Sequence, residues 1–494
     1  MVRLRRPDRT SSGMAARAQG RFHFPESLGR VNRAAMVKPG VRRRGHQTQR
    51  ESCALMTLAA AKIGDKTVAL TIQETACSDG AQPRSIRGYA WVIFALTFGL
   101  LLSDYMSRQV LNAVFPQIKA EWGLSDIQLG ALSGIVSLAV GILAFPLSLA
   151  ADRWGRVRSV TIMAAIWSIA TLLCGLSHNY FTLLSARFLV GVGEAAYASV
   201  GMAILISMFP ARHTSTVAGA FFAGSMVGSV MGIGLGGTLA SQFGWRSAFV
   251  GMAIFGIALT LLYMMVAKPS RIEGEKGQAT GIMQTESRAT VRVRHVLRDL
   301  FSSPVLICVY IGSGLQLFIN GGLLAWLPSF LNRVYDMPLS RAGGVAAIFV
   351  LCGACGMPLC GALSDRLGRG SPRRKILLAI TYNLACGALL FTAFQFRAGS
   401  AQLTLIALAM FFSAGIVGPS GTMVANLTPK AIHSTAMATL AFAFNILGLA
   451  PGSVVTGVLA DRLGLAPALQ LLPLASVASA VVLLIGVRHL RGER

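Results

Sequence analysis

Four charged side chains stand inside apolar stretches that are long enough to cross a lipid bilayer. Asp104 and Arg108 are four residues apart, and Arg187 and Glu194 are seven apart, so each pair shares one face of a helix. A charge at the centre of a spanning helix costs roughly 2.5–3.5 kcal/mol even on insertion scales, and such residues usually mark substrate or proton pathways. We therefore take these four as the first candidates for a functional site. The alternative is a buried ion network that only locks two helices together.

The stretches that carry these residues belong to a longer series. Of the 494 residues, 54% are hydrophobic and 13% are charged, and soluble domains carry about twice that share of charge. The composition argues against a water-soluble enzyme and predicts an all-α integral membrane protein. Since a bilayer core needs about 20 apolar residues per helix, we place twelve transmembrane helices at residues 88–112, 127–150, 159–178, 181–206, 217–240, 246–267, 304–327, 341–363, 376–396, 401–425, 434–459 and 466–487.

One long polar connection divides the twelve spans into six and six. We expect a six-helix bundle at residues 88–267, a cytoplasmic linker at 268–303, and a second bundle with a short tail at 304–494. Residues 1–87 hold 17 Lys and Arg against 6 Asp and Glu and contain no span. We expect them to be a disordered cytoplasmic extension, or to include residues upstream of the true start; contact with anionic lipid is the alternative.

The excess of positive charge indicates how the chain is oriented. Formal net charge is +26, but outside the first 87 residues Lys and Arg gather in gaps on one side of the spans, 20 against 6 on the other. Because Lys and Arg collect on the cytoplasmic side, we expect both termini to be cytoplasmic, in a plasma or inner membrane. The charge is thus a topology signal, and we expect no nucleic-acid partner.

A nine-residue segment recurs after the second span of each half. Residues 148–156 and 361–369 match at an offset of 213, and a weaker pair at 237–244 and 457–464 matches at an offset of 220. Two matches at nearly one offset indicate a duplicated six-helix unit. The repeated positions are Asp152, Arg153, Gly155 and Arg156 in the first half and Gly361, Asp365, Arg366, Gly368 and Arg369 in the second.

These two segments resemble the signature loop of the major facilitator superfamily. The resemblance covers about residues 88–490 and implies two pseudo-symmetric six-helix bundles that rock about a central substrate site. It also implies that the repeated residues form a latch that closes the cytoplasmic side, with Asp152 capping a neighbouring helix and pairing with Arg153 or Arg156. Ser148 stands where the family usually has Gly, so we expect looser packing there.

Two further segments are similar to the Spinster-like branch and to the neighbouring anion:cation symporters. They are residues 105–111, with Arg108, and residues 187–195, where Arg187 precedes a Gly-x-Gly-Glu-Ala sequence. Those branches carry Asp directly before the first Arg, whereas here the position holds Ser107 and the acid is Asp104. The fifth span is glycine-rich but lacks the Pro of the antiporter motif, which disfavours drug antiport.

The resemblance implies that the first and fourth spans line a central cavity. We expect Glu194, with Asp104 and Arg187, to couple transport to protons, because switching the contact of the Glu194 carboxyl group with the Arg187 guanidinium between conformations could load and release a proton. We expect Arg108 to hold an anionic group of the substrate. Weaker candidates for substrate contact, each of which could instead form an ordinary interhelical hydrogen bond, are Tyr197, Gln316, Asn320, Trp326 and Asn445.

The sequence therefore predicts a monomeric secondary active transporter of a small organic solute. We expect a carboxylate or other organic anion, moved by alternating access with proton coupling and with the lipid bilayer as surroundings. The alternative within transport is export of a lysolipid, another amphiphile or a drug. A non-transporting receptor and a membrane-embedded enzyme are the alternatives of another class. We expect no cofactor or metal, because Cys352 and Cys355 lie in an apolar run without a second ligand pair.

Overall fold

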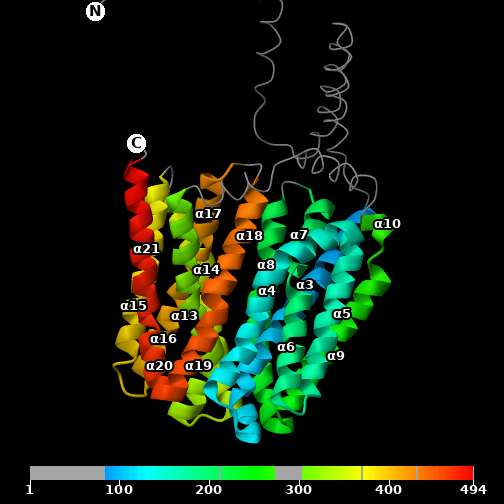
Figure 1. Cartoon of the computed structure of the whole chain (residues 1–494). Coiled ribbons are helices and arrows are strands. Elements are labelled where there is room, and N and C mark those ends of the chain that lie inside the picture. Colours follow the sequence, from blue (N-terminus) through cyan, green and yellow to red (C-terminus); the bar gives the residue numbers. More distant parts are fainter. Residues whose placement is uncertain (1–83, 211–212, 273–302, 369–370, 430–431, 493–494) are drawn as a thin grey trace, which may run out of the picture. The chain divides into compact units, whose positions relative to one another are not determined.

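Helices make up nearly all of the described chain (Figure 1). The computed structural model describes residues 84–210, 213–272, 303–368, 371–429 and 432–492. Within these ranges, twelve helices are long and apolar enough to cross a membrane. The predicted all-α fold with twelve spans is confirmed. The predicted extension before residue 84 and most of the predicted linker lie outside the described residues.

The first six spans are built from the helices between Arg84 and Val266, and a short helix follows them. Their bounds are α3 (Arg84–Trp122), α4 (Asp126–Trp154), α5 (Arg156–Gly175), α6 (Tyr180–Glu194), α7 (Tyr197–Met208), α8 (Thr214–Phe243), α9 (Trp245–Val266) and α10 (Pro269–Ile272). We call α3 to α9 the N-terminal bundle.

The second six spans begin at Pro304. Their bounds are α13 (Pro304–Tyr335), α14 (Leu339–Leu367), α15 (Pro372–Ala393), α16 (Ser400–Ser413), α17 (Val417–Leu427), α18 (His433–Ala443), the π-helix η4 (Phe444–Leu449), α19 (Ala450–Leu463), α20 (Leu465–Leu471) and α21 (Pro473–Gly492). We call these helices the C-terminal bundle.

Helices α3 and α13 both run well beyond the predicted ends of their spans. We expected ends at residues 112 and 327, but the helices continue through Pro116 and Pro328 to Trp122 and Tyr335. Hydropathy falls where polar residues and prolines begin, whereas helical hydrogen bonds persist as long as neighbouring helices pack around them. The extended part of α3 packs against α13 here, and the rings of Phe115 and Trp326 lie 5.3 Å apart.

Three predicted single helices are interrupted near the middle of their spans. The fourth span breaks directly after Glu194, the tenth breaks at residues 414–416, and the eleventh contains the π-helix Phe444–Leu449. Interruptions of this kind are common at functional sites in transporters and leave helix ends inside the membrane. The apolar composition of these spans gives no sign of the breaks.

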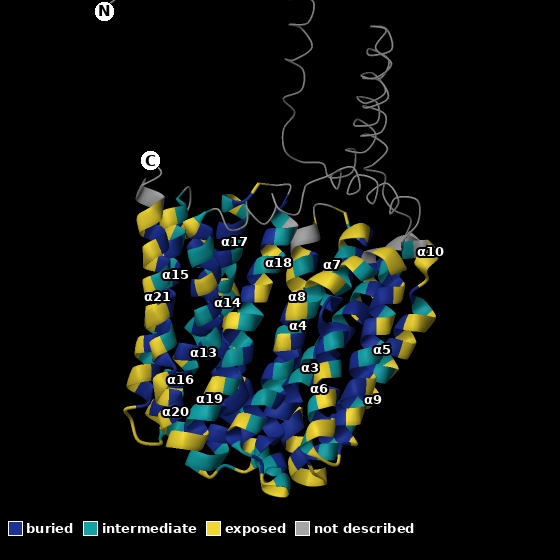
Figure 2. Cartoon of the chain, viewed as in Figure 1, coloured by how far each residue is buried: buried dark blue, intermediate teal, exposed yellow. Residues whose placement is uncertain are grey.

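Large apolar side chains cover the outside of the helices. Examples at half exposure or more are Ile254, Met264, Ile348, Phe391 and Leu474, and exposed residues follow the outward faces while buried ones lie between helices (Figure 2). A soluble protein rarely exposes so much contiguous apolar surface. The pattern fits a surface that faces lipid.

The two bundles touch through glycines at one end of the unit, where α3 and α13 end and α4 and α14 begin. We call this the closed end. A Cβ atom added to Gly130 of α4 would lie 2.5 Å from the carbonyl oxygen of Ser453 in α19, and one added to Gly457 would lie 2.4 Å from that of Asp126. On the other side, a Cβ atom added to Gly237 of α8 would lie 2.8 Å from the carbonyl oxygen of Leu339 in α14. Small residues allow such backbone-to-backbone contact between membrane helices.

This packing yields a stability prediction. Gly130→Ala should lower the thermal unfolding temperature of the purified protein, because the new methyl group must displace backbone; overpacking of this kind costs about 1–3 kcal/mol. Gly219→Ala is the matched control, since its Cβ atom meets nothing within 4 Å, and it should be neutral or slightly stabilising. Equal unfolding temperatures for Gly130→Ala and wild type would contradict the close contact.

Candidate functional site

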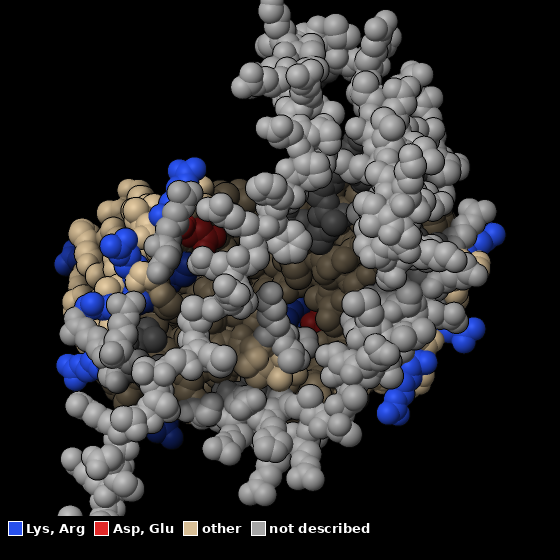
Figure 3. All heavy atoms as spheres, turned by 90° about the horizontal axis from the view of Figure 1, so that it is seen from above, with Lys and Arg blue, Asp and Glu red and all other residues tan. Residues whose placement is uncertain are grey.

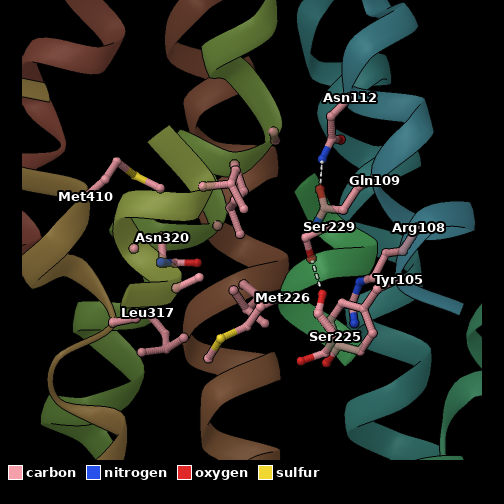
Figure 4. A pocket seen from close by; sticks show the side chains of 18 of the residues that line it. Tyr105, Arg108, Gln109, Asn112, Ser225, Met226, Ser229, Leu317, Asn320 and Met410 are labelled. Carbon is pink, nitrogen blue, oxygen red and sulfur yellow. Dashed lines mark hydrogen bonds between the residues drawn. The ribbon is translucent and has the colours of Figure 1, made fainter. Parts of the chain in front are cut away.

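A cavity of about 240 Å³ lies between the two bundles, near the middle of the spans. Viewed from the end opposite the closed end, the unit is hollowed between the bundles, and acidic and basic atoms are visible within the hollow (Figure 3). Polar side chains line it from α3, α4 and α8, and Figure 4 shows those of α3 opposite Asn320, Leu317 and Met410. The polar residues from the N-terminal bundle are Tyr105, Arg108, Gln109, Asn112, Ser133, Ser137, Ser225 and Ser229.

Arg108 is the one charged residue among the described residues that line this cavity. Its Nη1 atom lies 3.8 Å from Oε2 of Glu194, and its Nη2 atom donates a hydrogen bond to Oγ of Ser137. The side chain remains 17% exposed, whereas that of Glu194 is 4% exposed. Arg108 therefore faces the cavity with donors to spare, while its counter-charge lies behind it.

Asp104 and Glu194 form a buried pair of acidic side chains. Both carboxyl groups are buried and interact with each other, and Glu194 also forms the ion pair with Arg108. Asp104 Oδ1 and Glu194 Oε1 have no hydrogen-bond donor among the described groups. A proton held between the two carboxyl groups would supply the missing donor and would also balance two acids against one guanidinium.

Arg187 is fully buried and bonds to main-chain oxygens. Its Nε atom lies 3.4 Å from the carbonyl oxygen of Leu132, and its Nη1 and Nη2 atoms lie 3.1 and 3.2 Å from those of Ser107 and Arg108. This corrects the expected arrangement, because the guanidinium tied to Glu194 by an ion pair is that of Arg108. Carbonyl groups satisfy the Arg187 guanidinium, so it joins α6 to α3 and α4. Its predicted part in proton coupling stays a prediction.

A polar network that we did not anticipate extends from Arg108 along α3. Asn112 donates to Oε1 of Gln109 at 2.8 Å, and Ser133 donates to Oδ1 of Asn112 at 3.1 Å. The spacing could have revealed this wall, because Ser133 and Ser137 lie four residues apart on α4, as Ser225 and Ser229 do on α8. Each pair presents two hydroxyl groups on one helix face.

Of the five weaker candidates, Asn320 is the one that lines the cavity, and its amide donates to Oγ of Ser413 at 3.1 Å. The others form interhelical or local hydrogen bonds, which was the alternative given for each. The hydroxyl of Tyr197 donates to Thr97 O at 2.6 Å, and the amide of Gln316 lies 3.5 Å from Ser413 O.

Trp326 and Asn445 are likewise away from the cavity wall. The indole of Trp326 donates to Ser453 O at 2.9 Å, beside Phe115 at the closed end. The amide of Asn445 donates to Ala441 O, one turn earlier in the same span. The Cβ atom of Asn445, which belongs to η4, lies against Gly141 of α4. Neither Trp326 nor Asn445 is among the residues that line the cavity, and their predicted contact with the substrate stays a prediction.

Polar contacts between the bundles gather at the closed end. Arg333 of α13 forms two hydrogen bonds of 2.8 Å to the carboxylate of Asp126, which also pairs with Lys119 at 2.5 Å. Asp461 of α19 accepts hydrogen bonds from the main-chain N–H groups of Asp126 and Ile127 at 2.7 and 2.8 Å. A carboxylate at a helix N-terminus is stabilised by the helix dipole and by these free donors. Asp461 therefore caps α4 across the bundle interface.

Asp461 belongs to the weaker repeat, and the stronger repeat lies at the opposite end. There Gly155 joins α4 to α5 with a φ of 90°, which favours glycine, while Asp365 pairs with Lys375 of its own bundle at 3.0 Å. Arg153 and Arg366 lie in the last turns of α4 and α14, and Arg156 begins α5.

Of the remaining latch positions, some differ from expectation and others lie outside the described residues. Gly361 has open space around the position of a Cβ atom, so close packing does not explain this glycine, whereas Gly368 ends α14 tightly against Lys375. The side chain of Asp152 and all of Arg369 lie outside the described residues. The role of these segments as a latch stays a prediction.

Comparison with known proteins gives consistent results. Residues 97–451 match the Major Facilitator Superfamily. The chain is 26% identical to a gallate transporter of Pseudomonas putida over 82% of this chain and 94% of that protein. It is 27% identical to the cis,cis-muconate transport protein of Acinetobacter baylyi, over 77% of this chain and 90% of that protein. A crystal structure of a bacterial homologue of the human lysosomal transporter Spinster, inward-facing and unoccupied, superposes with a TM-score of 0.70 at 20% identity, covering 84% of this chain and 99% of that one.

The cap at the closed end can be tested by substitution. Asp461→Ala should destabilise the contact between α4 and α19 by about 0.5–2 kcal/mol, the usual cost of losing a helix cap. In a cysteine-free background, a cysteine at Ser133 should then react faster with a membrane-impermeant maleimide added from the closed end. The neighbouring Arg462→Ala variant is the control, because this substitution also removes a charge at the same place but leaves the Asp461 cap intact. The cap would be discounted if both variants reacted at the wild-type rate.

Proposed function

The chain belongs to the major facilitator superfamily and is a multi-pass membrane transporter, not an enzyme, and from that premise we propose that it moves a small organic anion together with protons. The observation that carries the proposal is the position of Arg108, whose guanidinium faces the cavity while its nearest acidic partner, Glu194, is buried behind it. A charged residue kept at this depth in a membrane is costly unless transport uses it.

The anion is proposed from the chemistry of Arg108 and from the relatives. A guanidinium binds a carboxylate through two parallel hydrogen bonds, and the hydroxyl group of Ser137, which accepts from Arg108, lies on the neighbouring face of α4 to add a further donor. The relatives named for gallate and cis,cis-muconate transport carry organic acids. Both lines support a carboxylate as the substrate group.

Proton coupling follows from competition for one guanidinium. When Glu194 is ionised, it attracts Arg108 and opposes binding of a second anion. When Glu194 is protonated, that attraction falls and Arg108 is free to hold the carboxylate of the substrate, with Asp104 sharing the proton. One proton and one carboxylate would thus bind together, which makes symport the natural direction of coupling.

Alternating access would use the contact between the bundles as its gate. The glycine packing and the contacts of Asp126 with Arg333 and Asp461 hold the closed end together. For the cavity to open there, these contacts must break while the opposite end closes. We propose that the opposite end faces the cytoplasm, together with both termini.

Export of a lysolipid or other amphiphile is the second candidate. The observation in its favour is the apolar wall that the C-terminal bundle contributes to the cavity. Against it stands the volume of about 240 Å³, which is below the roughly 300–1,000 Å³ of most ligand pockets. An amphiphile held by apolar area would depend little on the geometry of Arg108.

The first functional prediction concerns Glu194→Gln. Because glutamine resembles the protonated acid, the variant should bind substrate with an affinity that no longer rises as the pH falls, as wild type should. It should lose accumulation driven by a pH gradient but keep counterflow exchange, which needs no net proton movement. Uptake into proteoliposomes of the full chain, with and without the gradient, measures both.

Asp104→Asn is the companion variant, since Asp104 lies beside Glu194 and can share its proton. Accumulation by Glu194→Gln under a pH gradient would show that another group carries the proton. Folding of each variant is checked by its unfolding temperature, so that loss of protein is not mistaken for loss of coupling.

The second functional prediction separates the two candidate substrates. Arg108→Lys keeps the charge but loses the planar fork, so it should weaken an organic anion about tenfold or more. Arg108→Ala leaves two acids without their cation and should nearly abolish binding. An amphiphile should respond little to the lysine change. Equal affinity in wild type and both variants would exclude a direct role for Arg108.

A further inference from the structure

We infer that the substrate is a singly charged carboxylic acid with an apolar body, such as a ring monocarboxylate. This inference rests on the proposed function and narrows it, because it uses the opposite wall of the same cavity. The two walls differ in chemistry, and each is supplied by one bundle.

The N-terminal bundle supplies the polar wall. Arg108 stands at its centre, with amide and hydroxyl groups from α3, α4 and α8 around it. Part of this hydrogen-bonding capacity is already used, since Gln109, Asn112 and Ser133 bond to one another. Among its described residues the wall offers one cation, Arg108, and is therefore suited to one carboxylate.

The C-terminal bundle supplies an apolar wall. Its lining residues come from α13, α14, α16, α17 and η4 and include Leu317, Val350, Met357 and Met410. Asn320 is the exception, but its amide already donates to Ser413. In Figure 4, Leu317 and Met410 lie across the cavity from Arg108 and Gln109. The flexible, polarisable methionines can pack against a ring or a branched chain.

A second carboxylate on the substrate would lie against this apolar wall. Among the described residues that line the cavity, no second cation could pair with it there, because Arg108 serves the first carboxylate. Arg333, in the same bundle, is held by Asp126 at the closed end. Burying an unpaired charge is strongly unfavourable, and hydroxyl groups that exchange water for methyl groups also lose their hydrogen bonds. The wall thus selects against both dicarboxylates and polyhydroxylated acids.

The names of the relatives do not decide this point. Gallate has one carboxylate on an aromatic ring, whereas cis,cis-muconate has a carboxylate at each end. The distribution of polar and apolar residues in this cavity favours a single carboxylate, as gallate has, and disfavours the three ring hydroxyl groups that gallate also carries.

Calorimetric titration of the full-length protein in lipid nanodiscs tests the inference. The probes are benzoate, cyclohexanecarboxylate, terephthalate, cis,cis-muconate and gluconate, which vary the second charge and the hydroxyl groups separately. We expect the two ring monocarboxylates to bind at least about tenfold more tightly than the other three, and Arg108→Ala to abolish their binding.

A gain of charge on the apolar wall provides the second arm. Met357 is half-buried on α14 and lines the cavity. Met357→Lys should improve the affinity for terephthalate relative to benzoate about tenfold or more, because the new ammonium group can pair with the second carboxylate. Met357→Gln is the matched variant of similar length without charge, and it should leave that ratio within about threefold of wild type.

The outcomes distinguish this inference from the function on which it rests. Binding of terephthalate, cis,cis-muconate or gluconate by wild type as tightly as benzoate overturns the inference but leaves organic-anion transport standing. An unchanged ratio in a folded Met357→Lys variant also overturns it. If none of the five acids binds, the inference and the proposed substrate class both fail.

Discussion

The buried guanidinium of Arg187 ties together the helices that carry the polar side of the cavity. It is 1% exposed and reaches the carbonyl oxygens of Leu132 in α4 and of Ser107 and Arg108 in α3. A cation at this depth must be satisfied on all sides, and main-chain oxygens achieve this without a second charge. Because one of those carbonyls belongs to Arg108, the same contact fixes where the Arg108 side chain begins.

Because of this arrangement, the two arginines have different roles. Arg187 uses its donors within the protein, so it fixes α6 against α3 and α4 and leaves the cavity to Arg108. Arg108 has one carboxyl partner, Glu194, at 3.8 Å and one hydroxyl partner, Ser137. A looser ion pair beside a cavity can be exchanged for a ligand, whereas a guanidinium held by three carbonyls cannot without moving helices.

The contact between the bundles is built differently. It is formed by glycines, which have no side chain. Glycines on α4, α8 and α19 bring main chains together at the closed end, and a few charges around Asp126 secure the contact. Such an interface can open reversibly, because its backbone packing and exposed helix caps can separate and form again. The cavity lies beside this interface, so each of its walls belongs to a different bundle and the two walls can differ in chemistry.

The sequence by itself determined the class of protein and much of the cluster. Runs of about 20 apolar residues must be helices in a bilayer, since no other local structure satisfies their backbone there. That argument predicted twelve spans, and the structure confirms them. The four membrane charges stood out for the same reason. Helix period placed Asp104 with Arg108 and Arg187 with Glu194, but period says nothing about partners on other helices.

Only the tertiary structure decided which charges meet and which residues face the cavity. In the structure, Glu194 pairs with Arg108, and Arg187 bonds to carbonyl groups. The side chains of Tyr197, Gln316 and Trp326 form hydrogen bonds to main-chain oxygens away from the cavity. The structure also shows that Asp461, in the weaker repeat, reaches α4. These outcomes depend on the rotation of each helix about its axis and on its depth, which are set by packing against helices far away in the chain.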